Sequence, residues 1–349
     1  MSAGPDLAAL RPLDPGAAVS VVIPARGAAE LLADCLAAVL PQLRTDDEIV
    51  VAAADPATAD AARALAVTEP RLRVVANPDG TTPAALNRAI AATDRPVVLR
   101  VDAQARLPDG YRDRTVAALA GGAAVAGGRQ VARAADGFAA AVAAAMNGPL
   151  GHGGAAYRSG SAAGPVDTVY LGVFRRDVLA AVGGYDERFR TNQDAELNER
   201  VRRAGGTVVL LPDLEVAYLP RGDVAGLARQ FRGYGRGRAM TARRHPGSLR
   251  IRQLAAPVLV TALAGAAATA VVGAVLGAGR WTAVPLIAGV GGYGALLGVG
   301  AFRAGPAARR RPLSVALALA TMHLAWGAGF LRTVLRPLPG RTGDRADRG

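Results

Sequence analysis

Short apolar runs alternate with amphipathic segments up to about residue 250 of this 349-residue chain. Runs rich in valine, isoleucine and leucine, which are typical of buried strands, lie at 19–23, 48–51, 72–76 and 96–101. Apolar residues recur at helical spacing in the segments between them, which are 30–43, 56–65 and 83–92. This alternation, with its short connections, predicts an α/β fold with a mostly parallel, Rossmann-like sheet.

Polar or turn-forming residues follow each predicted strand, namely Pro24, Asp55, Asn77 and Asp102. Open parallel sheets bind their ligands beyond the carboxyl ends of the strands, so these positions are candidates for a site. Taken alone, Asp102 is explained more simply as a turn or capping residue. A functional interpretation therefore needs a second signal from elsewhere in the chain.

A second acidic cluster opens a predicted helix at 192–203, whose sequence is NQDAELNERVRR. Its carboxylates are Asp194, Glu196 and Glu199. Acidic residues in a first helical turn are also favoured by the helix dipole, which is the structural explanation. A predicted strand at 166–174 precedes this helix, and another at 207–211 follows it.

The chain after residue 250 has a different pattern, with apolar runs at 254–276, 281–302 and 313–335. Each is about 22 residues long, enough to cross a hydrocarbon core of about 30 Å at about 1.5 Å per residue. The segment before them, 223–250, holds a basic amphipathic helix, which indicates a position on the membrane surface.

Charge predicts the orientation of these runs. The link between the second and third runs holds Arg303, Arg309, Arg310 and Arg311, so the positive-inside rule places it and the α/β domain in the cytoplasm. With three crossings the basic tail would face outward, which conflicts with the same rule. A re-entrant run in place of one crossing is the alternative.

These patterns divide the chain into five regions. They are a flexible N-terminus (1–17), the α/β domain (18–222), the interfacial helix (223–250), a membrane region of about three spans (251–336) and a tail (337–349). The start of the chain lacks the basic and apolar regions of a signal peptide.

Composition narrows the class of partner. The net charge is +13 and the sequence contains no lysine, so every basic side chain other than histidine is arginine. Aromatic content is only 4%, and no basic stripe interleaved with aromatics occurs, which argues against nucleic acid. The one cysteine, Cys35, excludes an internal disulfide and a cysteine metal cluster.

The two acidic segments suggest complementary chemistry. A carboxylate at a strand end with a polar ligand two residues later, as in Asp102 and Gln104, can hold Mg²⁺ or Mn²⁺ against a diphosphate. A second carboxylate, Asp194, can then remove a proton from an attacking hydroxyl.

The segments VSVVIPARGAAE, PAALNRAI, RVDAQA and NQDAELNERVRRAGG together resemble the family 2 inverting glycosyltransferases of GT-A fold. The resemblance is closest to the bacterial, membrane-linked branch typified by succinoglycan glucosyltransferases. It covers roughly residues 18–244 and includes the middle segment VDTVYLGVFRRDVLAAVGGYDERF.

The resemblance implies roles for individual residues. Asp102 and Gln104 would occupy the metal-binding D-x-D positions, and Asp194 would be the catalytic base. The other donor or acceptor contacts would be Pro24, Arg26, Asp55, Asn87, Gln230 and Arg232. Ala52 stands where the family usually has an aspartate that contacts the nucleoside, and Gln104 replaces the second acidic residue of D-x-D.

The activity implied is transfer of a sugar, with inversion, from a nucleotide sugar to a polyprenyl-linked saccharide in exopolysaccharide or cell-envelope synthesis. The expected donor is a UDP-sugar, and the expected location is the cytoplasmic face of a bacterial plasma membrane, with several membrane passes. Two alternatives stay open: a polyprenyl-phosphate glycosyltransferase, and an inactive membrane-anchored scaffold that binds nucleotide sugars. The oligomeric state is open as well.

Overall fold

The computed structural model describes residues 6–336. Its centre is a mixed sheet in the order β3-β2-β1-β4-β7-β5-β8-β6. The strands are β1 (Val19–Ala25), β2 (Glu48–Ala53), β3 (Leu72–Ala76), β4 (Val97–Arg100), β5 (Val125–Ala132), β6 (Gly164–Pro165), β7 (Tyr170–Arg175) and β8 (Val208–Tyr218). The first four strands are parallel to one another, as the alternating pattern predicts. β7 enters antiparallel between β4 and β5.

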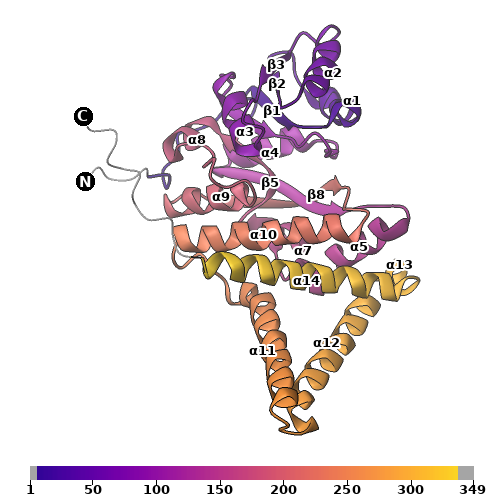
Figure 1. Cartoon of the computed structure of the whole chain (residues 1–349). Coiled ribbons are helices and arrows are strands. Elements are labelled where there is room, and N and C mark those ends of the chain that lie inside the picture. The colour runs from indigo at the N-terminus through magenta and orange to yellow at the C-terminus, as the bar shows by residue number, and fades with distance from the viewer. Residues whose placement is uncertain (1–5, 337–349) are drawn as a thin grey trace, which may run out of the picture.

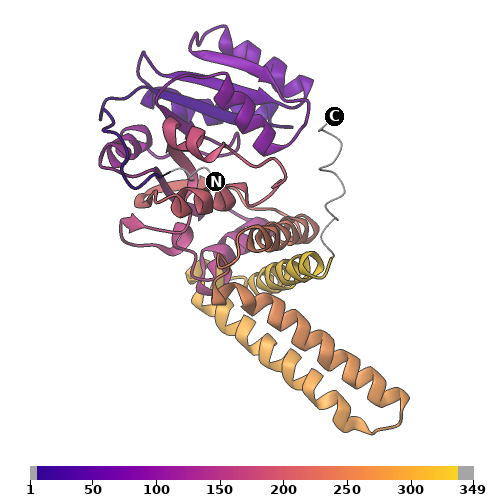
Figure 2. The ribbon, with the colours of Figure 1, turned by 90° about the vertical axis from the view of Figure 1, so that its left-hand side faces the viewer.

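Helices cover both faces of the sheet because its central strands are apolar on both sides. Val21 and Ile23 of β1 pack with α1 and α4, whereas Val22 packs with α3, α8 and α9. The helices of this domain are α1 (Ala29–Val39), α2 (Pro56–Ala66), α3 (Thr82–Ala91), α4 (Tyr111–Ala120), α5 (Gly137–Asn147), α6 (Pro149–His152), α7 (Ala156–Ser159), α8 (Arg176–Val182) and α9 (Gln193–Arg203). Figures 1 and 2 show the sheet between these layers.

The topology brings strand ends together along one edge of the sheet, which we call the carboxyl edge because the parallel strands finish there. β1, β2, β3 and β4 all end there, and β7 begins there because it runs the other way. β5 and β8, which are antiparallel to β7 and parallel to each other, also end there. Tyr170 and Tyr218 therefore join this edge, from the start of β7 and the end of β8.

β8 is longer than the predicted strand at 207–211. It passes through Pro212 and Asp213 and continues to Tyr218, and its second half pairs with β5 after a register shift. Its side chains alternate, with Leu214 and Val216 buried and Asp213 exposed, which is strand periodicity without a continuous apolar run.

The predicted N-terminal lead-in packs against the domain where the structure describes it. Leu7 is buried, and its backbone N–H donates to the carbonyl of Ala204 just after α9. The predicted tail, 337–349, lies outside the described residues.

The remaining helices form a separate layer (Figures 1 and 2). They are α10 (Val224–Arg244), α11 (Ala255–Val275), α12 (Val284–Arg303), α13 (Pro306–Arg309) and α14 (Pro312–Val334). α10 and α14 lie side by side under the α/β domain, and α11 and α12 project from them as a hairpin. The α11, α12 and α14 segments are each long and apolar enough to cross a membrane.

Candidate active site

One arginine joins the two aspartates that the sequence singles out. Arg100, the last residue of β4, donates from Nε and Nη2 to Oδ1 of Asp102, at 3.0 and 2.8 Å. Its Nη1 donates to Oδ1 of Asp194 in the first turn of α9. The Arg100 side chain is only 5% exposed, whereas those of Asp102 and Asp194 are 20% and 26% exposed. The guanidinium is therefore buried beneath two carboxylates that remain open to solvent.

The backbone before α9 explains how Asp194 reaches this place. Asn192 caps the helix with φ of +67°, a left-handed conformation that asparagine tolerates better than most residues. Its side-chain amide donates to the hydroxyl of Thr241 in α10. A Cβ on Gly237 of α10 would lie 2.7 Å from the carbonyl oxygen of Thr191, so only glycine lets α10 approach this turn.

Burial and neighbouring charges shift the pKa values of Asp194 and Arg100. Burial raises the pKa of Asp194, and the neighbouring charge of Asp102 adds to that effect against the opposing influence of Arg100. Burial alone would lower the pKa of Arg100, but the two aspartates raise it well above its usual value. Arg100 therefore stays charged, while Asp194 has a greater proton affinity than an ordinary aspartate.

Asn87 acts on this site through the loop between α8 and α9. Its Nδ2 donates to the carbonyl of Tyr185 at 2.8 Å and to Glu187 at 3.0 Å, and its Oδ1 accepts from the N–H of Tyr185 at 2.9 Å. The Tyr185 ring is buried, and its pKa is raised by burial and then by Asp194. Both amide hydrogens of Asn87 are thus already used. Its geometry is that of a residue that positions Tyr185 beside Asp194.

A cavity of about 260 Å³ opens at the carboxyl ends of β1 and β3. It is lined by Pro24, Ala25, Arg26, Asn77, Gly80, Thr81, Thr82, Ala85 and Arg190. Arg26 donates to the carbonyl of Gly80 at 3.2 Å, so its guanidinium lies over the turn that follows β3. Arg190 comes from the loop that leads to Asp194. Two guanidinium groups at one small cavity suit an anionic ligand such as a diphosphate.

Asp55 supports the wall of this cavity. It caps α2 by accepting from the N–H and the hydroxyl of Thr58, each at 2.9 Å, and it accepts from the N–H of Gly27 at 2.7 Å. These hydrogen bonds lower its pKa, that of Gly27 most strongly. The carboxylate therefore ties the loop after β1, which holds Arg26, to the start of α2.

Gln230 lies apart from the cavity, in a cluster of tyrosines. Its Nε2 donates to the hydroxyls of Tyr218 and Tyr234, at 2.6 and 3.0 Å. Tyr218 packs edge-on against Tyr170, with ring centroids 6.5 Å apart. Burial raises the pKa of Tyr170, and the negative charge of Asp102 raises it further.

The tyrosine cluster has unused hydrogen-bonding capacity. Among residues 6–336, Tyr170 Oη, Gln230 Oε1 and Arg158 Nη1 are buried without a hydrogen-bond partner. Arg158 belongs to α7, and Tyr157, Tyr234 and Tyr218 raise its pKa against the effect of burial. Buried polar groups without partners are costly, which marks the cluster as a place where a polar ligand or water would bind. Arg232, by contrast, is exposed on α10.

The described side chains could hold a divalent cation only together with ligand atoms from a bound substrate. No group of three or more histidine, cysteine or acidic side chains within 6–336 is placed to hold a metal ion. Asp102 accepts from Arg100 through Oδ1, which leaves Oδ2 as its second potential ligand atom, and Gln104 is exposed two residues later. Mg²⁺ and Mn²⁺ are often held by one or two carboxylates together with substrate phosphates, and Asp102 suits that arrangement.

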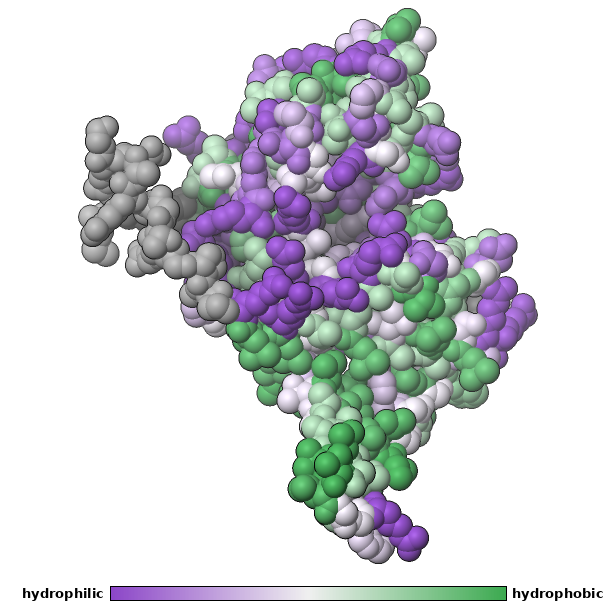
Figure 3. Space-filling model, in the orientation of Figure 1, coloured by the Kyte–Doolittle hydropathy of each residue, from purple (hydrophilic) through white to green (hydrophobic). Residues whose placement is uncertain are grey.

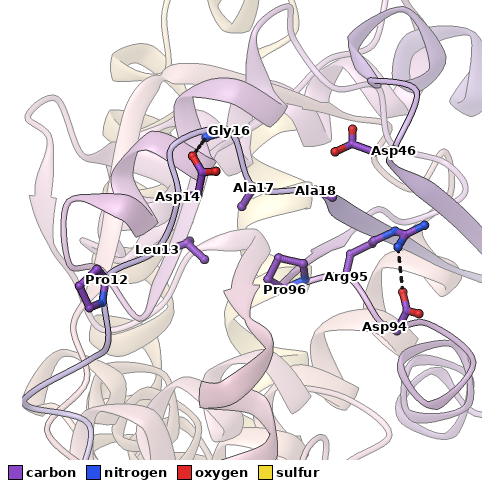
Figure 4. Close-up of a pocket in the computed structure, with 10 residues that line it drawn as sticks. All are labelled: Pro12, Leu13, Asp14, Gly16, Ala17, Ala18, Asp46, Asp94, Arg95 and Pro96. Atoms are coloured by element: carbon purple, nitrogen blue, oxygen red, sulfur yellow. Dashed lines mark hydrogen bonds and ion pairs between the residues drawn. The ribbon is translucent and has the colours of Figure 1, made fainter.

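A larger hollow lies at the opposite edge of the sheet (Figure 4). It has a volume of about 590 Å³ and is lined by residues that precede β1, β2 and β4, including Ala18, Asp46 and Pro96. Two of its interactions lie within the lining itself: Asp94 pairs with Arg95 at 3.3 Å, and Asp14 accepts from the N–H of Gly16. Parallel sheets bind ligands at the other edge, so we assign the site to the smaller cavity.

Sequence reasoning did not identify Arg100, Tyr185 or Arg190. The sequence did contain a signal for Arg100, because an arginine within the apolar run VVLRV is expected to be buried and therefore to pair with an acidic side chain. Tyr185 and Arg190 gave no such signal, because loops bring them to the site.

Comparison with known proteins places the chain in a family. Residues 15–235 match the model described as glycosyltransferase-like family 2. The chain is 36% identical to the succinoglycan biosynthesis protein ExoA of Rhizobium meliloti (strain 1021) over 288 residues, which are 80% of this chain and 82% of that protein.

A solved structure supports the fold. The mannosyltransferase PcManGT of Pyrobaculum calidifontis, determined with GDP-Man and Mn²⁺, has 19% sequence identity and a TM-score of 0.55, and the match covers 96% of this chain and 90% of that one. The resemblance seen in the sequence is therefore confirmed: this chain belongs to the family 2 glycosyltransferases and has their GT-A fold.

Proposed function

We propose that this glycosyltransferase moves a sugar, with inversion, from a nucleotide sugar to a lipid-linked saccharide at the cytoplasmic face of the membrane, in exopolysaccharide or cell-envelope synthesis. The observation that carries the proposal is the pair of carboxylates, Asp102 and Asp194, held by the buried Arg100 at the same edge of the sheet as a cavity lined by two arginines. The similarity to a succinoglycan biosynthesis protein supports the same class of product.

Asp194 is the base in this proposal. It removes the proton from an acceptor hydroxyl, whose oxygen forms a bond to the anomeric carbon while the bond from that carbon to the diphosphate breaks. The acceptor attacks opposite the leaving group, so the configuration inverts. Burial raises the pKa of Asp194, which increases its affinity for the proton it must accept.

The donor lies at the carboxyl edge of the sheet. The cavity beside Pro24 takes the nucleotide, and Arg26 and Arg190 face its diphosphate. Asp102, with Gln104 nearby, would hold Mg²⁺ or Mn²⁺, which would supply positive charge to offset that of the departing nucleotide. The neighbour determined with GDP-Man and Mn²⁺ supports a donor and cation of this kind. A UDP-sugar is the first donor to test.

The acceptor approaches from the membrane side. The tyrosine cluster joins β7 and β8 to α10, and Arg158 and Gln230 offer the acceptor polar atoms that have no partner within the described chain. Hydroxyls and amides of this kind suit a saccharide, and the arginine suits a phosphate.

The test offers UDP-, GDP- and dTDP-sugars to the purified protein with a polyprenyl-diphosphate saccharide and Mn²⁺, and detects products by mass spectrometry. We expect one added sugar from one donor class. Asp102→Ala should weaken donor binding measured by calorimetry with Mn²⁺ and change it little without Mn²⁺. A product formed only on polyprenyl phosphate would support the first alternative activity. Donor binding without transfer to either acceptor would support the inactive scaffold, and absence of binding to any donor, with or without Mn²⁺, would contradict the proposed function.

A further inference from the structure

The three apolar segments differ in how much of each the protein itself covers. In their most apolar 18-residue windows, 6% of the α11 segment and 11% of the α12 segment are buried, compared with 44% of α14. Val275 is 80% exposed and Ile287 is 68% exposed on the hairpin. Figure 3 shows apolar residues covering the hairpin, while polar residues predominate on the α/β domain. The hairpin thus has the exposed apolar surface of a membrane-inserted element, whereas the protein itself covers nearly half of α14.

α14 lies along α10 rather than along the hairpin (Figure 1). A Cβ on Gly235 of α10 would collide with the carbonyl oxygen of Trp326, and one on Gly329 of α14 would collide with that of Arg232. Arg243, near the end of α10, donates to the carbonyl of Thr333 near the end of α14 at 2.7 Å. Backbone contact at Gly235 and Gly329 and this hydrogen bond near both carboxyl ends show that the two helices run parallel.

α10 cannot enter the hydrocarbon core. It holds Arg229, Arg232, Arg236, Arg238, Arg243 and Arg244, and it packs on the turn before α9 through Gly237. The cost of burying arginine in a membrane keeps such a helix at the surface. A helix that follows α10 along its length lies at the same depth.

The contacts of α14 with the hairpin lie at the start of α11 and along the second half of α12, where the Tyr293 hydroxyl hydrogen-bonds Nδ1 of His323 at 3.0 Å. A Cβ on Gly327 would meet the carbonyl of Ala256, at the start of α11. A Cβ on Gly300, near the end of α12, would lie 3.1 Å from Leu319. α14 therefore lies across the two legs where they leave the protein, as the base of the triangle in Figure 1.

Charge supports the same arrangement. The tip between the legs holds Arg280 beside Trp281, and the leg bases are close to Arg252, Arg303 and Arg309. A crossing by α14 would put Arg332 and Arg336 on the far side with Arg280. With α14 in the plane of the membrane, they stay on the side with the other arginines, as the positive-inside rule requires.

We propose that the chain crosses the bilayer only as the α11–α12 hairpin. In this arrangement α14 is a second interfacial helix, which lies beside α10 and holds the α/β domain at the lipid surface. The covered face of α14, with Val315, Leu319 and Met322, packs on the protein. Its open face, with Leu313, Leu317 and Leu324, contacts lipid at the headgroup boundary. The hairpin legs, of 21 and 20 residues, are each about 30 Å long, enough to cross once each. This inference rests on the proposed membrane association and is independent of the glycosyl transfer.

The test labels single cysteines with a membrane-impermeant maleimide in spheroplasts and in inverted vesicles. Cys35, the native cysteine, is replaced by alanine. Leu313→Cys and Leu335→Cys report the two ends of α14, where the native side chains are 84% and 79% exposed. Asp109→Cys marks the α/β domain and Arg280→Cys the hairpin tip, and both native residues are exposed.

We expect both ends of α14 to label from the same face as Asp109→Cys, and Arg280→Cys to label from the opposite face. Labelling of Leu335→Cys from the Arg280→Cys face would show that α14 crosses and would overturn the inference. Labelling of Leu335→Cys only after detergent addition would place it in the hydrocarbon core and overturn the inference as well. If Asp109→Cys and Arg280→Cys label from one face, the hairpin does not cross, and the proposed membrane passes fail instead. Unfolding midpoints of the single-cysteine variants close to that of the Cys35→Ala protein show that they report on the native fold.

Discussion

Two arginine–carboxylate clusters lie at opposite edges of the same sheet, and they differ in how fully their charges are paired. At the amino edge, Arg112 and Asp47 are 1% and 0% exposed. Both oxygens of Asp47 accept from Arg112, and they also accept from the N–H groups of Val19 and Arg44, at 2.7 and 2.8 Å. At the carboxyl edge, Arg100 serves two carboxylates that are partly open.

In the proposed mechanism, this difference separates a structural pair from a reactive one. Four donors saturate Asp47, so it has little capacity left to bind a substrate. Asp194 shares its arginine with Asp102, and its raised pKa records the incomplete compensation. An ion pair in a glycosyltransferase indicates function when it is under-compensated and accessible, not merely when it is buried.

The largest expected effect is that of Asp194→Asn. Loss of a general base typically lowers kcat by about 10²- to 10⁴-fold, and the amide keeps the shape of the side chain. We expect a decrease in this range in initial transfer rates, with donor affinity by calorimetry unchanged. The matched variant Asp47→Asn should keep its turnover per folded molecule and lose thermal stability. Normal turnover by Asp194→Asn would remove the base from the mechanism and favour a phosphate acceptor, which needs none.

The next effect compares the two arginines. Arg100→Met leaves Asp102 and Asp194 without their shared cation, and we expect transfer to decrease about 10- to 100-fold, the range seen when an orienting partner is lost. Arg112→Met leaves a buried Asp47 uncompensated and should destabilise the fold by about 3–5 kcal/mol. Rate measurements and thermal unfolding in detergent separate the outcomes. Equal loss of activity per folded molecule in both variants would erase the distinction between the clusters.

The smallest effect is on pH dependence. Because the folded protein raises the pKa of Asp194, the folded state binds more protons than the unfolded chain above the ordinary value of 3.8. The contribution of Asp194 to stability is thus present at low pH and is lost as pH rises through the raised pKa. The unfolding midpoints of the wild type and Asp194→Asn should be similar at low pH. Above the raised pKa of Asp194, the variant should have the higher midpoint. The acid limb of kcat/KM should lie above the range of an ordinary aspartate.

The sequence predicted the fold because periodicity reports which face of a strand or helix is buried. It also predicted that Asp102 and Asp194 belong together, a pairing that the structure makes through Arg100. It did not predict the second half of β8, since Pro212 and Asp213 interrupt the apolar run while the alternation continues. The partners of Asn87 and Gln230 depend on loop geometry and helix packing, which single residues do not encode.

Hydropathy could not distinguish α14 from the hairpin. An apolar helix can have the same composition whether lipid surrounds it or whether it packs on protein with one face and contacts lipid with the other. The difference comes from glycines at Gly235 and Gly329, whose meaning depends on which helix lies opposite.

The glycine contacts of α10 connect α14, the proposed interfacial helix, with the turn that precedes Asp194. α10 touches α14 through Gly235 and the turn at Asn192 through Gly237, and that turn sets the position of Asp194. Close-packed interfaces transmit small displacements because they leave no room to absorb them. Lateral pressure or bilayer thickness, acting on α14, would therefore reach Asp194 through one intervening helix. We expect turnover in this glycosyltransferase to change with acyl-chain length at constant substrate, so that lipid composition itself acts as a regulator.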